Sequence, residues 1–239
     1  VIIDRKDNDL IIADAENRRV MRWSPHSNSS PQIIIDEIDC LRLAMHEDGS
    51  LYVSDYKNDE VKRWKKGETH GTIVAGGNGK GNQLNQLNWP NFIYVDADLS
   101  LYVSDRHNHR VMKWVKDAQE GIIVAGGNGQ GNSLTQLNDP RGLVVDQLGQ
   151  IYVADGENNR IMRWCEGDKQ GSIVVNENEK GQRFNELNFP IGLSFDRQGN
   201  LYATDCCNHR IQKFEMDLII LISNLKKNKT SKRFSLKCF

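Results

Sequence analysis

The chain has 239 residues and a formal net charge of −1, a length that allows one domain with a large buried core. Its five cysteines lack any repeat spacing and so do not indicate a disulfide framework. Six basic residues and no acid lie in 226–239, which leaves a net charge of about −7 on the rest of the chain. That balance argues against a strongly basic RNA-binding face.

The same short phrase ending in aspartate occurs five times, first as Ile12-Ala13-Asp14 and last as Ala203-Thr204-Asp205. Successive aspartates lie 41, 50, 50 and 50 residues apart. A period in this range is typical of solenoids, propellers and arrays, so the repeat decides the fold class. The anchoring aspartates are Asp14, Asp55, Asp105, Asp155 and Asp205.

Each unit begins with two apolar runs joined by a turn, which predicts two paired strands. In the fourth and fifth units the turn reads Asp-x-x-Gly, at 146–149 and 196–199, a pattern that favours a type I turn. The third unit has Leu99 in place of this glycine, which predicts a less regular turn.

A third strand is predicted after each anchor, where an asparagine, a β-branched residue and an aromatic follow at fixed spacing. A fourth apolar run, such as Ile122-Ile123-Val124, completes the unit, and no helical periodicity appears. The asparagines are Asn17, Asn58, Asn108, Asn158 and Asn208, and the aromatics, which we assign to core packing, are Trp23, Trp64, Trp114, Trp164 and Phe214.

Four short strands every fifty residues indicate an all-β fold, a β-propeller of four-stranded antiparallel blades. Strands that lie between neighbouring blades are apolar on both faces, as the run Leu101-Tyr102-Val103 is. Residues 218–239 show no repeat feature and are expected to form a disordered basic tail, whose short apolar run is far below the ~20 residues of a membrane span. The propeller is predicted over 1–217, with blades at about 1–38, 39–88, 89–138, 139–188 and 189–217.

The phrases Asn108-His109-Arg110-Val111 and Asn208-His209-Arg210-Ile211, each preceded by a Tyr-x-x-Asp phrase, resemble the NHL repeat. The resemblance covers roughly residues 1–216 and implies a six-bladed propeller in which the histidine of the motif is structural. Because five blades are recognisable, we expect an incomplete six-bladed ring, as a fragment of a longer protein. Blade 2 departs from the family pattern with Asp59-Glu60, and the short first interval predicts a tighter loop between blades 1 and 2.

Three motifs that could carry chemistry have structural explanations. The glycine-rich loops 76–81 and 126–131 resemble phosphate-binding loops, but they join blades instead of opening a helix. The anchoring aspartates are expected to accept hydrogen bonds from loop N–H groups instead of binding a metal. The zinc lyases of the resembled family place histidines where this chain has Asn91, Arg141 and Ile191. The sequence therefore predicts no catalytic residue, no cofactor and no metal ligand.

Candidate binding residues lie where otherwise matching blades differ, because loops on a rigid scaffold carry the function of such folds. These positions are the entrance to the inner strand and the loop after each anchor. They are Asn91, Arg141, Ile191, Tyr56, Lys57, Arg106, His107, Gly156, Glu157, Cys206 and Cys207.

The expected function is a non-catalytic scaffold that binds a protein partner. The resemblance to the propellers of tripartite-motif proteins implies the substrate-recruiting part of a ubiquitin ligase, with the ligase activity in another domain. Two alternatives are an RNA-binding propeller of a post-transcriptional regulator and a metal-dependent lyase or lactone hydrolase. We expect a cytoplasmic location, and the oligomeric state is left open.

Overall fold

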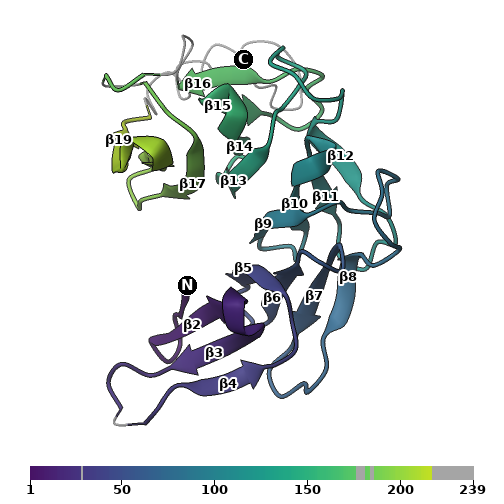
Figure 1. Ribbon diagram of the computed structural model, residues 1–239, viewed down its shortest axis with the longest axis vertical. Helices are drawn as coiled ribbons and strands as arrows, with labels where there is room; N and C mark the ends of the chain where they lie inside the picture. The colour runs from purple at the N-terminus through teal and green to yellow at the C-terminus, as the bar shows by residue number, and fades with distance from the viewer. Residues whose placement is uncertain (28, 176–180, 184–185, 217–239) are drawn as a thin grey trace, which may run out of the picture.

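The computed structural model describes the chain apart from residue 28 and the segments 176–180, 184–185 and 217–239. Almost every regular element within the described residues is a β-strand, and the strands form five antiparallel sheets arranged as the blades of a propeller (Figure 1). The all-β propeller predicted from the repeat is therefore confirmed. In every sheet the strands lie in the order in which they occur along the chain.

The strands of each blade have the following bounds. Blade 1 comprises β1 (Ile2–Asp4), β2 (Asp9–Asp14), β3 (Arg19–Trp23) and β4 (Gln32–Ile35). Blade 2 comprises β5 (Cys40–Met45), β6 (Leu51–Asp55), β7 (Glu60–Trp64) and β8 (Thr72–Gly76). Blade 3 comprises β9 (Pro90–Val95), β10 (Leu101–Asp105), β11 (Arg110–Trp114) and β12 (Ile122–Gly126). Blade 4 comprises β13 (Pro140–Val145), β14 (Ile151–Asp155), β15 (Arg160–Trp164) and β16 (Ser172–Val175).

Blade 5 has three strands among the described residues, β17 (Pro190–Phe195), β18 (Leu201–Asp205) and β19 (Arg210–Phe214). The apolar run 218–222 lies outside the described residues. A single turn of 3-10 helix follows the anchoring aspartate in four blades. These turns are η1 (Ala15–Asn17), η2 (Arg106–Asn108), η3 (Gly156–Asn158) and η4 (Cys206–Asn208).

The blades form an arc, with the inner strands β5, β9, β13 and β17 on its concave side (Figure 1). Packing between blades runs from each inner strand to the next, from β5 to β9, to β13 and to β17. Blades 1 and 5 stand at the two ends of the arc, on either side of its open side (Figure 1). The shape sets the inner strands and the loops at their ends around one shared concave region.

The connections between blades follow the sequence intervals. β4 ends at Ile35 and β5 begins at Cys40, whereas β8 ends at Gly76 and β9 begins only at Pro90. The tighter loop expected between blades 1 and 2 is therefore confirmed. The expectation of a less regular turn at Leu99 is wrong, because this residue adopts φ 63° and its N–H reaches the Asp96 carbonyl at 3.1 Å, as in the glycine-containing turns.

The core lies between the blades, because each sheet is apolar on both faces. All five residues of β6, β10 and β14 are buried. Trp114 pairs with Leu101 and is 2% exposed, since Tyr52 and Val61 of blade 2 cover that face of blade 3. A Cβ at Gly121 would come within 2.9 Å of the Trp114 ring, so the glycine lets the indole lie flat against the loop.

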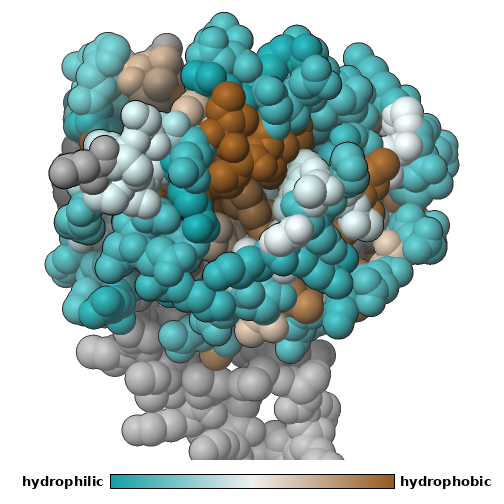
Figure 2. All heavy atoms as spheres, turned by 90° about the horizontal axis from the view of Figure 1, so that it is seen from below, coloured by the Kyte–Doolittle hydropathy of each residue, from teal (hydrophilic) through white to brown (hydrophobic). Residues whose placement is uncertain are grey.

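The corresponding face of blade 1 is more open. Trp23, which occupies the position of Trp114, is 39% exposed, and Ile3 is 59% exposed. The outer strand β4 also exposes Ile33 and Ile34. Seen from below, from the end at which β4 lies in Figure 1, the surface shows an apolar patch within largely hydrophilic surroundings (Figure 2). No helix among the described residues is long and apolar enough to cross a membrane.

Candidate functional site

The anchoring aspartates accept hydrogen bonds from the asparagine that follows them. Asp105 accepts hydrogen bonds from the backbone N–H of Asn88 at 2.7 Å, the side chain of Asn108 at 2.8 Å and Nε of Arg110 at 2.7 Å. The same three types of donor recur around Asp205, where burial raises the carboxyl pKa but the donated hydrogen bonds hold it below its ordinary value. In blades 3 and 5 the aspartate side chain thus connects the incoming loop, the motif asparagine and the motif arginine.

The motif arginine fastens the loop that enters its blade. Arg110 is 4% exposed, and beyond its pair with Asp105 it donates to the carbonyls of Asn82, Gln83 and Gln86. Arg160 and Arg210 repeat this pattern on the next two loops. These contacts explain the glycine-rich loops as connectors whose carbonyls are held by arginine.

Blade 2 departs from the family pattern with a glutamate in place of the motif arginine, and the length of the incoming loop explains this difference. Glu60 occupies the position of Arg110, opposite Asp55 in the sheet register. The loop that enters blade 2 spans only residues 36–39, so it offers no counterpart of the carbonyls that Arg110 binds. Glu60 is buried and pairs instead with Lys62, at 2.7 Å.

Three residues before an inner strand adopt the left-handed backbone region, namely Trp89 (φ 60°), Asp139 (φ 57°) and Phe189 (φ 57°). A bulky residue in this region is uncommon and is sustained only by surrounding structure. Each backbone N–H is held by a side chain of the preceding blade: by Asp59 at 2.7 Å, His109 at 3.2 Å and Asn159 at 2.9 Å, respectively. The motif histidine His109 thus has a structural contact, as the resemblance implied.

An aromatic stack crosses from blade 2 to blade 3 on the side of the loops that follow the anchors. The rings of Tyr56 and Trp89 lie 4.8 Å apart, and those of Trp89 and His107 lie 5.1 Å apart. The guanidinium of Arg106 lies 5.8 Å from the Trp89 ring centroid, within the range of a cation–π contact. Burial, followed by the charge of Arg106, lowers the pKa of His107.

Cations outnumber acids around this stack. Asp39 binds both Arg18 at 3.2 Å and Lys57 at 2.9 Å. The hydrogen bond from Lys57 is the main cause that lowers the pKa of Asp39. Asp139 likewise binds two arginines, Arg106 and Arg141. Each of these two carboxylates is therefore shared by two cations, so this side carries a local excess of positive charge.

Six residues on this side, with side chains that are exposed or half-buried, come together from three consecutive blades. We call them the rim surface: Tyr56, Lys57, Trp89, Arg106, His107 and Arg141. Five of them are candidates from the sequence, and Trp89 is an addition. Trp89 could have been found by the same criterion, because the residue before the inner strand varies between blades: Asp39, Trp89, Asp139 and Phe189.

The other candidates lie in different surroundings. Gly156 is buried, and Asn91 is 2% exposed. Ile191 is half-buried at the start of β17, and Glu157 is exposed. Cys206 and Cys207 are exposed free cysteines in η4 and do not form a disulfide with each other.

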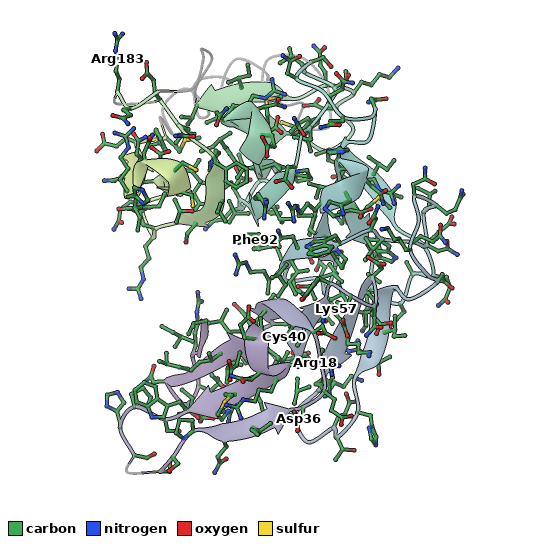
Figure 3. All side chains as sticks on the ribbon, in the orientation of Figure 1. Arg18, Asp36, Cys40, Lys57, Phe92 and Arg183 are labelled. Atoms are coloured by element: carbon green, nitrogen blue, oxygen red, sulfur yellow. The ribbon has the colours of Figure 1, made fainter. Side chains whose placement is uncertain are left out.

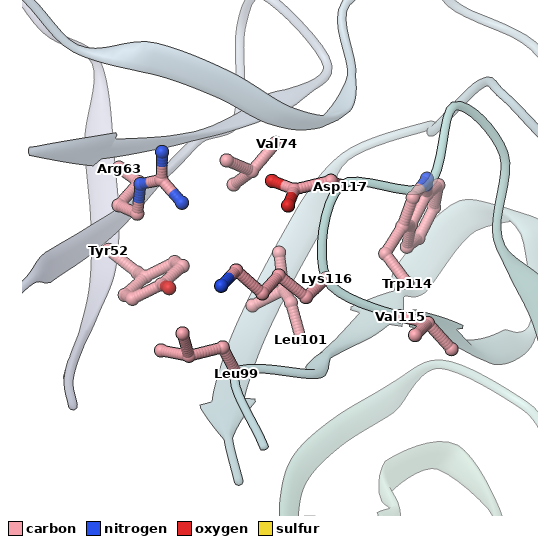
Figure 4. A pocket seen from close by; sticks show the side chains of 9 residues that line it. All are labelled: Tyr52, Arg63, Val74, Leu99, Leu101, Trp114, Val115, Lys116 and Asp117. Carbon is pink, nitrogen blue, oxygen red and sulfur yellow. The ribbon is translucent and has the colours of Figure 1, made fainter. Parts of the chain in front are cut away.

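One small pocket lies between blades 2 and 3, away from the candidate residues (Figure 4). Its walls include Tyr52 and Arg63 of blade 2 and Lys116 and Asp117 after β11. Within the described part of the chain, no group of three or more His, Cys, Asp or Glu side chains is arranged to hold a metal ion.

Comparison with known proteins identifies the repeat. The family model "NHL repeat" matches residues 87–114, 137–163 and 187–214, which lie in blades 3, 4 and 5. No curated protein matches the chain.

Solved structures share the fold at low sequence identity. An auxiliary nutrient binding protein from Bacteroides ovatus is 16% identical, with a TM-score of 0.65 over 86% of this chain and 56% of that one. The gluconolactonase XC5397 from Xanthomonas campestris is 15% identical, with a TM-score of 0.65 over 88% of this chain and 72% of that one. A chain of a nidogen/laminin complex is 18% identical, with a TM-score of 0.60 over 87% of this chain and 78% of that one.

This chain thus spans little more than half of the nutrient-binding protein. Identities of this size establish a shared fold alone, since one fold supports many unrelated functions.

Proposed function

We propose that this chain, a β-propeller with NHL repeats, is a non-catalytic scaffold. In this proposal a partner protein binds on the rim surface. The observation that carries the proposal is the Tyr56–Trp89–His107 stack with Arg106 against it. Tyrosine, tryptophan and arginine are the residues in which binding hot spots are enriched.

The rim surface is also held in place before any partner arrives. The backbone of Trp89 is fixed by Asp59, and Arg106 is fixed by its ion pair with Asp139. A preformed surface loses little side-chain entropy on binding, so more of the contact energy is available as affinity. A related fold occurs in a chain of the nidogen/laminin complex, which supports a propeller as a partner in protein assembly.

A site-specific crosslinking experiment tests this proposal without deleting any part of the fold. A photoreactive phenylalanine derivative replaces His107, which is exposed on the rim surface. The matched control places it at Ile122, which is 55% exposed on the outer strand β12. In extracts of the source cells, we expect a discrete protein adduct from position 107 that position 122 does not give. Equal labelling at both positions, or no protein adduct at 107, would contradict the proposal.

RNA is the second candidate partner, because stacked aromatics flanked by cations also suit unstacked bases. Two readouts separate it from a protein. Adducts to RNA disappear on ribonuclease treatment, and RNA affinity falls steeply with salt because phosphate binding releases counterions. A ribonuclease-sensitive adduct at position 107 would favour RNA over protein.

The third candidate function is that of a metal-dependent lyase or lactone hydrolase. The similar fold of the gluconolactonase supports considering it. Turnover of a sugar lactone that stops on addition of a chelator would establish it. The substrate-recruiting role in a ubiquitin ligase extends the main proposal, and it requires that partners crosslinked at position 107 become ubiquitinated by the endogenous protein.

A further inference from the structure

The inner strands β5, β9, β13 and β17, which lie on the concave side of the arc, each begin with a bulge (Figure 1). In blade 3, Pro90 pairs with Asp105 and Ile93 with Val103, so one extra residue stands in β9. The same shift occurs in blades 2, 4 and 5. Bulges re-aim side chains and are frequent beside functional sites. The matching bulge positions are Arg42, Phe92, Gly142 and Gly192.

Two of these positions hold large side chains in contact with each other. The guanidinium of Arg42 lies 4.4 Å from the centroid of the Phe92 ring, and Phe92 stands at the concave edge of the arc (Figure 3). In blades 4 and 5 the position is glycine, so no side chain projects there. Of the four bulge positions, only those of blades 2 and 3 therefore carry a large side chain; at Gly142 a Cβ would collide with the Ile191 carbonyl, because the inner strands of blades 4 and 5 approach closely there.

Arg42 is a half-buried cation without an acidic partner. Among the described residues no carboxylate lies within the 4.0 Å of a salt bridge, and its buried Nε has no hydrogen-bond partner. Burial, followed by the charge of Arg141, lowers the pKa of its guanidinium. A partly desolvated cation next to a second cation is unfavourable unless an anion completes the site.

Two further residues of the inner strands bear on this position, the cation Arg141, whose charge acts on Arg42, and the buried Asn91. Arg141 binds the carboxylate of Asp139, which Arg106 also binds, and its guanidinium lies 5.1 Å from the centroid of the Phe189 ring. Asn91 precedes Phe92 in the bulge, is 2% exposed, and its side-chain oxygen has no hydrogen-bond partner. Buried polar atoms in folded proteins are almost always hydrogen-bonded, so the unpaired Nε–H donor of Arg42 indicates a place where an acceptor group would be stabilised. The Asn91 oxygen is itself an acceptor, so it would take an N–H group of a bound segment and not a carboxylate.

We propose that Arg42, Phe92 and Arg141 form a subsite that binds a carboxylate of the partner protein, supplied by an aspartate or glutamate side chain or by a free C-terminus. The inference rests on the proposed function and names the chemistry of the bound segment. Guanidinium groups bind carboxylates through paired, charge-assisted hydrogen bonds. The Phe92 ring provides an apolar wall for the carbon atoms that carry the carboxylate.

Short peptides separate the two sources of the carboxylate. Acetyl-Gly-Glu-Gly-amide carries only a side-chain carboxylate, acetyl-Gly-Ala-Gly acid only a terminal one, and acetyl-Gly-Ala-Gly-amide neither. Each is titrated into the purified full chain, and binding is followed by calorimetry and by NMR of the arginine Nε–H groups. We expect one or both acidic peptides to bind and to shift the Arg42 signal, while the neutral amide leaves it unchanged.

Arg42→Gln is expected to weaken the binding of the acidic peptide by about tenfold or more, since a hydrogen bond to a charged group contributes on that scale. Arg63→Gln is the matched control. Arg63 also has a buried Nε without a partner, but it lies by Tyr52 between blades 2 and 3, away from the concave side. Equal losses in both variants, or no binding of either acidic peptide, would overturn the subsite. Binding of inorganic phosphate without binding of the peptides would overturn it as well.

The crosslinking experiment distinguishes failure of this inference from failure of the proposed function. If position 107 still gives its protein adduct in the Arg42→Gln chain and the acidic peptides do not bind, the scaffold stands and the subsite is wrong. If the acidic peptides bind through Arg42 but position 107 gives no protein adduct, the anion site stands and its ligand is not a protein held on the rim surface.

Discussion

The Nδ1 atom of His109 accepts the backbone N–H of Asp139 at 3.2 Å, so the histidine of blade 3 holds the left-handed residue that opens blade 4. An imidazole accepts a hydrogen bond at Nδ1 only in its neutral form, with its proton on Nε2. Burial lowers the pKa of His109, consistent with that neutral form.

This contact predicts a pH dependence of stability. Because the folded chain lowers the pKa of His109, the unfolded chain binds a proton more readily, and the free energy of unfolding falls as the pH decreases. The contribution is fully present above the unfolded pKa of about 6.5 and is lost as the pH falls through the folded value. Urea unfolding at about pH 7.5 and about pH 5.5 measures it.

His109→Asn is the matched control, because Asn159 makes the same contact to Phe189 in the next blade. We expect this variant to keep most of the stability at neutral pH and to show a weaker loss in acid. Part of the loss persists through His107, whose pKa is also lowered. An unchanged pH dependence in His109→Asn would show that the hydrogen bond to Asp139 is not linked to protonation.

Arg110→Ala tests the fastening of the incoming loop. The change removes the cation that pairs with the buried carboxylate of Asp105 and the arginine contacts of three loop carbonyls, so we expect a loss of about 3 kcal/mol or more in the free energy of unfolding. Arg19→Ala in blade 1 removes the equivalent pair with Asp14, whose two side chains are solvent-accessible, and should cost clearly less. Similar losses in the two variants would contradict this reading.

A pair of tryptophans tests the packing between blades. Trp114 is 2% exposed and Trp23 is 39% exposed at matching positions. Trp114→Ala should destabilise the chain by about 3–5 kcal/mol, because it opens a cavity between blades 2 and 3. Trp23→Ala should cost clearly less, and a difference near zero in thermal unfolding would mean that the two faces are equally covered.

Glu60→Arg tests whether restoring the family pattern helps blade 2. The arginine would gain Asp55 across the sheet but would find no loop carbonyls, and Lys62 would lose its partner. Each buried donor left unpaired costs about 1–3 kcal/mol, so we expect a net loss of stability. A gain measured in the same urea titration would show that the short connection 36–39 is not the reason for glutamate here.

The repeat made the blades predictable because strand spacing and anchor chemistry recur in every copy. Asp105 and Asp205 were recognisable as structural residues, since an acid beside a turn has backbone donors within reach. The turn at Leu99 was misjudged. A leucine in the left-handed region is unfavourable locally, and the hydrogen bonds that the turn makes to Asp96 sustain it.

The sequence predicted five of the six residues of the rim surface, but not how they contact each other. Tyr56 and His107 stood out because they differ between blades, but their contact through Trp89 depends on how one blade lies against the next. Arg42 could not be predicted as a binding residue from the sequence, because its surroundings also depend on how neighbouring blades pack. Its meaning comes from the Phe92 ring of the neighbouring blade and from the missing carboxylate, neither of which a repeat period encodes.

The inner strands pack from β5 to β9, β13 and β17, so each of these blades contacts the blades next to it in the sequence. Stability in such a series is close to a sum over neighbouring pairs, and a terminal unit has one neighbour where a central unit has two. Opening should therefore start at blades 1 and 5 and reach blade 3 last. Backbone amides of β10 in blade 3 would then exchange their hydrogens most slowly, and amides of blades 1 and 5 would exchange faster.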